Sequence, residues 1–245
     1  MRWIYCLCIT LLICSDVFAE EIIFRPEDDS YERVSPGILF DPPPEYYGGT
    51  YPDYIFSYCY IAPSSKDVRY AGVRYKLDIP KDAIVLRASL SFYLTSTVYD
   101  SPDLRIYYED SGSSQPFTLS FYDISGRVLS GSSVLWQEWN LFPGAVPPVP
   151  GYDGAWFNSN DISGLVREFL TRPDWESGNH LTFILVPEGQ SYFHFFSEDI
   201  YGGAYAAQLQ IFFFSPSELG GKFVSILFGL SGIVSAGLMV YSLLD

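Results

Sequence analysis

The chain has 245 residues, of which 48% are hydrophobic and 18% aromatic, and this is enough apolar material for one substantial core, so a disordered polypeptide is excluded. The formal net charge is −15, from 14 Lys and Arg against 29 Asp and Glu, without a basic cluster. Binding to a phosphate backbone needs clustered Lys and Arg, so we expect no nucleic acid partner.

An export signal is indicated at the start of the chain. Arg2 supplies a positive charge, residues 4–14 form a mostly apolar run, and Val17-Phe18-Ala19 is typical of a cleavage site that ends on a small residue. We therefore expect residues 1–19 to be a signal peptide and residues 20–214 to form one extracellular β-sandwich domain. Three of the four cysteines fall in the signal, so the exported part has no disulfide framework.

Carboxylates are crowded shortly after the signal. Asp28, Asp29 and Glu32 lie within five positions, ahead of a Pro/Gly turn. Ca²⁺ prefers such hard oxygen ligands, with backbone carbonyls completing its shell, so these residues predict a structural calcium site. Other acidic residues predicted to reach the same ion are Glu109, Asp110, Glu198 and Asp199. The alternative interpretation is a set of solvated turn carboxylates without an ion.

Tyrosines are concentrated in the next Pro/Gly-rich segment. Tyr46, Tyr47, Tyr51 and Tyr54 lie there, where rings have few core positions to fill. Proteins bind sugars by stacking the C–H faces of the sugar on exposed rings, with nearby polar groups fixing the orientation. We therefore expect these tyrosines to bind a polysaccharide or surface glycoconjugate. The tryptophans Trp136, Trp139, Trp156 and Trp175 are expected to be core or lid anchors.

The rest of the exported region reads as all-β, because short runs rich in Tyr, Phe, Val and Ile alternate with Pro, Gly, Ser and Asp clusters. The clearest alternation is at residues 85–94, where Ala88, Leu90, Phe92 and Leu94 share one face. Further strands are expected at residues 71–78, 104–109, 117–122, 180–187, 193–197 and 206–214. Many short strands at this spacing predict a sandwich or jelly roll.

One helix is expected to interrupt the strands. Asp161 is a natural N-cap, apolar residues recur at helical spacing through Phe169, and Pro173 prevents continuation. We expect this helix to cover one end of the sandwich.

The chain ends in an uncharged hydrophobic segment, residues 223–244, after a linker at 215–222. As a helix the segment is long enough to cross a bilayer. The nearest basic residue, Lys222, precedes the segment instead of following it, so the positive-inside rule does not support a simple single-pass anchor. A glycolipid-attachment signal, in which the tail is removed, is the alternative. Either mode tethers the domain to a membrane at the cell surface, and small residues spaced four apart in the segment also permit self-association.

Two segments carry a resemblance to a known family. Residues 74–90 (RYKLDIPKDAIVLRASL) are similar to the pattern R-F-D-x-x-x-P-x-G-A-x-I-x-x-A-x-L of DNRLRE-type, disaggregatase-related extracellular domains. Residues 161–179 (DISGLVREFLTRPDWESGN) resemble the family's D-[LV]-[ST]-x-[IL]-V-x-E-x-[VL]-x-R-P-x-W-x-S-G-N segment, and the acidic residues 27–32 resemble its N-terminal element. Asp82 departs from the family, which has Gly there. The resemblance implies a carbohydrate-binding jelly roll or a structural surface module.

Enzyme classes find little support. The chain has only 2 His and no G-x-S-x-G motif, which disfavours a Ser/His/Asp hydrolase, and it lacks phosphate-binding loops and Cys/His zinc spacings. We therefore expect a non-enzymatic, exported and membrane-tethered binding module, with adhesion to glycan as its role. The alternative is a structural surface or sheath protein that assembles through aromatic patches without a small ligand.

Overall fold

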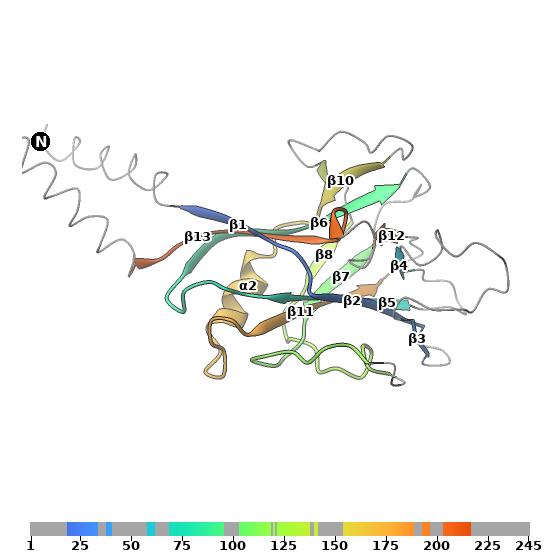
Figure 1. Ribbon diagram of the computed structural model, residues 1–245, viewed down its shortest axis with the longest axis horizontal. Helices are drawn as coiled ribbons and strands as arrows, with labels where there is room; N and C mark the ends of the chain where they lie inside the picture. Colours follow the sequence, from blue (N-terminus) through green and yellow to red (C-terminus); the bar gives the residue numbers. More distant parts are fainter. Residues whose placement is uncertain are drawn as a thin grey trace, which may run out of the picture. The chain divides into compact units, whose positions relative to one another are not determined.

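The computed structural model describes residues 19–33, 38–40, 58–61, 69–95, 103–118, 120, 122–137, 140–141, 154–188, 193–196 and 203–216. These residues form an all-β sandwich of two antiparallel sheets with a single short helix (Figure 1). The chain divides into two compact units, a larger one of residues 21–81 and 85–212 and a smaller one of residues 1–20, 82–84 and 213–245. Within the smaller unit, the Ser215 hydroxyl donates a hydrogen bond to Asp82 at 2.9 Å.

The five-stranded sheet, called sheet A, has the order β1 (Glu20–Phe24), β13 (Gln208–Phe214), β6 (Ile84–Thr95), β10 (Gly154–Asn158) and β9 (Asn140–Leu141). The six-stranded sheet, called sheet B, has the order β3 (Ile38–Phe40), β2 (Asp28–Arg33), β5 (Arg69–Lys76), β11 (His180–Pro187), β7 (Leu104–Tyr108) and β8 (Val134–Trp136). A small third sheet pairs β12 (Phe193–Phe196) with β4 (Tyr58–Ile61).

The strand order is that of a jelly roll. Taken in chain order, its eight strands are β1, β5, β6, β7, β8, β10, β11 and β13. The first is a neighbour of the last, the second of the seventh, the third of the sixth and the fourth of the fifth, and successive pairs alternate between sheet A and sheet B. The fold is therefore one long antiparallel ribbon rolled into two sheets, as the sequence predicts.

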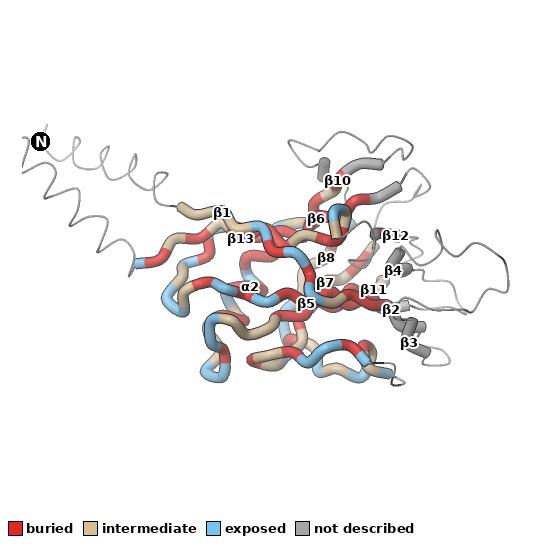
Figure 2. Tube along the Cα trace, in the orientation of Figure 1, coloured by how far each residue is buried: buried red, intermediate tan, exposed pale blue. Residues whose placement is uncertain are grey.

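The core between the sheets is aromatic. Phe92 of β6 stacks on Trp136 of β8 with ring centroids 5.4 Å apart. On β5, the Tyr75 ring meets Phe183 of β11, and its hydroxyl donates a 3.2 Å hydrogen bond to the Ala207 carbonyl. Buried residues accordingly run along the facing strands (Figure 2). Rings from both sheets thus hold the two layers together.

Helix α2 (Ser163–Leu170) joins the two sheets at one end of the sandwich. The Ile162 amide donates to the carbonyl of Ala88 in β6, while the Phe169 ring packs edge-on against Tyr108 of β7. The helix begins at Ser163 with Ile162 at the N-cap, so the prediction that Asp161 is the N-cap is wrong by one residue. From the preceding position, the Asp161 carboxylate accepts a hydrogen bond from the Ser163 amide at 2.9 Å. The predicted helical lid is confirmed.

Most predicted strands are present, with small shifts at their ends, but one is wrong. The described residues of 117–122, namely 117, 118, 120 and 122, lie outside strands. Phe117 instead turns its ring onto the outer face of sheet B, where it packs with Ile124 and Ile184. A tertiary apolar contact therefore replaces the strand that the local pattern favoured.

Within the described ranges, no helix is long and apolar enough to cross a membrane. The hydrophobic segment 223–244, residues 217–222 of the linker and the predicted signal through residue 18 lie outside the described residues. The tether and the signal stay predictions.

Candidate functional site

The four tyrosines predicted to bind glycan lie outside the described residues, in the connection between β3 and β4. The described tryptophans follow the sequence prediction, because Trp136, Trp156 and Trp175 are all buried. Trp139 lies outside the described residues. Within the described part of the chain, the one aromatic residue among the exposed large hydrophobics is Tyr122.

The predicted calcium ligands lie in a strand. Asp28, Asp29 and Glu32 all belong to β2, where successive side chains point to opposite faces of the sheet. Asp28 accepts a 2.7 Å hydrogen bond from the Phe117 amide, and Asp29 is buried. Across the residues that the structure describes, no group of three or more His, Cys, Asp and Glu is placed to hold a metal ion. Of the further predicted ligands, Glu198 and Asp199 lie outside those residues.

A row of polar side chains crosses the outer face of sheet B, the face turned away from the core. Asp28 of β2 lies directly opposite Arg74 of β5, which lies opposite Thr182 of β11. Glu109 follows β7 and donates its amide to the Thr182 carbonyl at 2.9 Å. We call these four residues the outer polar row. Arg74 and Thr182 are 7% and 0% exposed, so polar groups that ordinarily face water are buried here.

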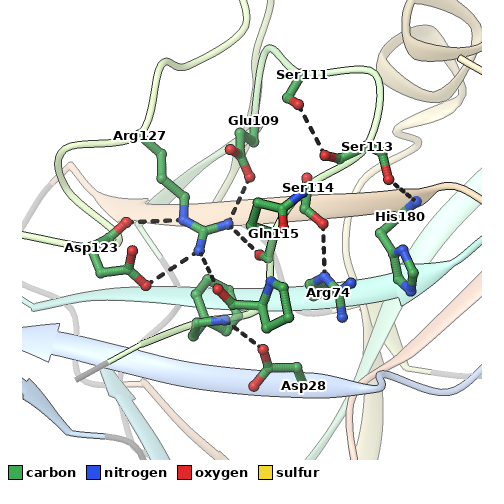
Figure 3. A network of polar contacts seen from close by, with 12 residues as sticks. Asp28, Arg74, Glu109, Ser111, Ser113, Ser114, Gln115, Asp123, Arg127 and His180 are labelled. Carbon is green, nitrogen blue, oxygen red and sulfur yellow. Dashed lines mark hydrogen bonds and ion pairs between the residues drawn. The ribbon is translucent and has the colours of Figure 1, made fainter. Parts of the chain in front are cut away.

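The segment that buries the row, residues 110–130, is called the strap. Arg74 donates from Nε to the Ser114 carbonyl at 3.1 Å, and Asp28 receives the Phe117 amide (Figure 3). The Ser114 amide donates to the His180 carbonyl at 2.9 Å. Arg74, Asp28 and strand β11 therefore hold the strap by hydrogen bonds to the strap's backbone.

Arg127 organises the strap from within. Its guanidinium donates to the carbonyls of Asp123, Gln115 and Pro116 and to the carboxylates of Glu109 and Asp123. The Arg127 side chain is only 7% exposed, and its contact with Glu109 is 2.7 Å long. Each of its three nitrogens thus has an acceptor, which is what a buried guanidinium requires.

The apolar part of the strap rests on a glycine. Gly72 of β5 lies opposite Ile184, and a Cβ atom on Gly72 would overlap the Phe117 ring. The same ring lies under the Arg127 guanidinium, 4.5 Å from ring centroid to Cζ. Gly72 is therefore required here because the ring approaches the backbone closely.

A second ionic cluster connects the strap to the chain after helix α2. Arg172 pairs with Asp110 and, at 3.0 Å from Nε, with Asp174. Asp174 also accepts the Gly112 amide at 3.2 Å, and the Asn179 side chain donates to the Gly112 carbonyl. The pairing with Arg172 holds the pKa of Asp174 below its usual range. Polar residues of the segment 161–179 thus serve to position the helix and the strap.

The Tyr108 hydroxyl lies beside this cluster and donates to Glu168 at 3.1 Å. Burial and the neighbouring Glu168 carboxylate raise the pKa of Tyr108 to about 12. The phenol therefore stays protonated far above neutral pH, which suits a structural donor better than an acid or base of catalysis.

The roles of Arg74 and Arg127 were missed by sequence reasoning. Arg74 alternates with the buried Val73 and Tyr75, which is a recognisable signal for the outward face of a strand, but nothing local shows that this face is covered. Arg127 lies in a segment without periodicity. The partners of both come from distant parts of the chain.

The chain matches no family model and no curated protein sequence.

Proposed function

We propose that the chain is an exported, membrane-tethered jelly-roll module that binds a glycan or another surface glycoconjugate through Tyr46, Tyr47, Tyr51 and Tyr54. The observation that carries the proposal is that the described part of the chain buries its tryptophans and exposes a single large aromatic ring. The buried Trp136, Trp156 and Trp175 belong to the packing of the described part, which leaves Tyr122 as its exposed ring. A stacking surface of several rings must then come from elsewhere in the chain, and the connection between β3 and β4 is the segment richest in tyrosine beside Pro and Gly.

The place of this connection in the fold supports the same proposal. β3 is one of the two edge strands of sheet B, and β3 and β4 lie away from helix α2 (Figure 1). Loops carried by a rigid sandwich are where binding residues are concentrated in such folds. The resemblance to DNRLRE-type domains, carried by residues 74–90 and 161–179, favours the same class of ligand, although the described residues of those segments serve the fold.

The test is a glycan array probed with the purified full chain in mild detergent. We expect selective binding that is lost when all four tyrosines are replaced by Ala, and largely retained when they are replaced by Phe, because Phe keeps the stacking face. Tyr122→Ala is the matched control, since it removes an exposed ring outside the connection. An array without signal, together with concentration-dependent self-association of the full chain, would instead establish the assembly-forming alternative.

The tether is tested separately by the intact mass of the mature protein. A membrane-spanning anchor predicts that residues 223–245 are present in the product, whereas a glycolipid signal predicts their loss together with an added lipid mass. Finding an unmodified product that lacks these residues contradicts both modes.

A further inference from the structure

Two buried hydroxyls under the strap have unused hydrogen-bonding capacity. Among the residues that the structure describes, the hydroxyls of Ser114 and Thr182 find no hydrogen-bond partner. Arg74 uses Nε for the Ser114 carbonyl, while the nearest acidic oxygen to its Nη1, on Glu27, is 3.8 Å away. Burial is the largest influence on this guanidinium, and it lowers the pKa of Arg74.

These groups converge on one place. Arg74 and Thr182 are direct cross-strand partners on the same face, which sets their Cβ atoms about 4.5–5.5 Å apart. Ser114 lies above them, fixed by the bond from Arg74 to its carbonyl and by its own amide bond to His180. Figure 3 shows Arg74 beneath Ser114, with His180 beside it. The strand register and these two bonds therefore place Thr182 and Ser114 as neighbours of Arg74, between sheet B and the strap.

The charge around this space selects the occupant. Arg74 is compensated electrostatically by Asp28, Glu27 and Glu109 and opposed by the guanidinium of Arg127, and Glu27 also lies 2.7 Å from His180. An anion would add negative charge where three carboxylates already act beside two guanidinium groups. A neutral molecule that both accepts and donates fits better, since it accepts from Arg74 and completes both hydroxyls. Water meets this requirement, and buried waters typically make about three such bonds.

We propose that an internal water molecule is bound between Arg74, Ser114 and Thr182 and forms part of the attachment of the strap to sheet B. The site is distinct from the proposed glycan-binding tyrosines and does not depend on them. It explains why two hydroxyls are retained where isosteric apolar side chains would fit: each is one half of a water-mediated contact.

The test is a double-mutant cycle on the full chain in detergent, with Thr182→Val and Ser114→Ala, followed by the fluorescence of the buried tryptophans during heating. A shared water predicts that each variant lowers the Tm by about 2–4 °C and that the double variant lowers it no further than the larger single effect. Thr182→Ser, which keeps the hydroxyl, serves as a second variant and is expected to lower the Tm less than Thr182→Val. The exposed Ser177→Ala is the control and leaves the Tm unchanged.

Other outcomes overturn the proposal. If the hydroxyls lack any partner, Thr182→Val raises the Tm because it removes an uncompensated buried polar group. If the effects of the two variants simply add, no molecule is shared between them. If chloride raises the Tm of the parent chain and not that of Thr182→Val, the occupant is an anion instead of water.

Discussion

The guanidinium of Arg127 lies over the ring of Phe117, with Cζ 4.5 Å from the ring centroid, and this contact joins two parts of the strap. Arg127 satisfies the polar groups of the strap, and Phe117 supplies its apolar contact with Ile124 and Ile184. Loss of either side chain should therefore destabilise the attachment of the strap to sheet B.

Replacing Arg127 with Met is expected to lower the free energy of unfolding by about 3–5 kcal/mol, the usual cost of removing one partner of a buried ion pair. The variant leaves Glu109 and Asp123, which are 16% and 20% exposed, without their cation. Urea unfolding followed by tryptophan fluorescence measures the change. Arg127→Lys is expected to fall between the parent and Arg127→Met, because an ammonium cannot reproduce the fork of the guanidinium.

The matched control is Arg105→Met. Arg105 pairs with Glu188 at 2.6 Å, but the two side chains are 31% and 39% exposed, so the loss in unfolding free energy is expected to be much smaller than for Arg127→Met. Equal losses for the two variants would show that Arg127 has no special role in the strap.

Gly72→Ala tests the close approach of the Phe117 ring to β5. The added methyl group overlaps the ring, so we expect a loss of about 1–3 kcal/mol in the free energy of unfolding. The same change at Gly131, where a Cβ meets nothing within 4 Å, is the control and should have little effect. In the double variant Gly72→Ala/Phe117→Ala, the loss of unfolding free energy should be smaller than the sum of the losses in the two single variants. Strict additivity would argue against the contact.

Sequence periodicity is sufficient to predict an element where one of its faces is buried against the core. The alternation of Ala88, Leu90 and Phe92 placed β6, and the helical spacing ending before Pro173 placed α2. Both patterns reflect the burial of one side of an element against the core, which leaves a direct trace in the order of residues.

The strap was not predictable in the same way. Phe117 was assigned to a strand because aromatic residues favour strands, but its ring is buried by Gly72 and Ile184, which are far away in sequence. The pairing of the acidic residues 28 and 29 with β5 is hidden in the same way, because nothing local in the sequence indicates it. Contacts of this kind depend on register between distant strands, and a single sequence holds no signal for them.

The calcium ion expected from the sequence gives a test that is independent of the strap. If Asp29 ligates such an ion, EDTA lowers the Tm of the full chain, added Ca²⁺ restores it, and Asp29→Asn abolishes the response. Asp161→Ala is the matched control, because it removes the carboxylate that accepts the Ser163 amide at the start of helix α2 and so lowers the Tm while leaving the EDTA response intact. A Tm that EDTA does not change rejects the ion.

The raised pKa of Tyr108 predicts how stability depends on alkaline pH. The folded protein keeps the phenol proton up to a pKa of about 12, whereas the unfolded chain releases it near 10. Between these values the folded state binds more protons than the unfolded state, so this contribution is fully present below pH 10 and is lost as the pH rises toward 12. In Tyr108→Phe the contribution is absent, so the difference in unfolding free energy between parent and variant should shrink over this range.

Urea unfolding of both proteins from pH 9 to pH 12 measures the difference, and the absorbance at about 295 nm of the parent minus the variant reports the titration of this phenol alone. A difference spectrum with its midpoint near 10 would show that Tyr108 is hydrated and would contradict its burial against Phe169 and Glu168.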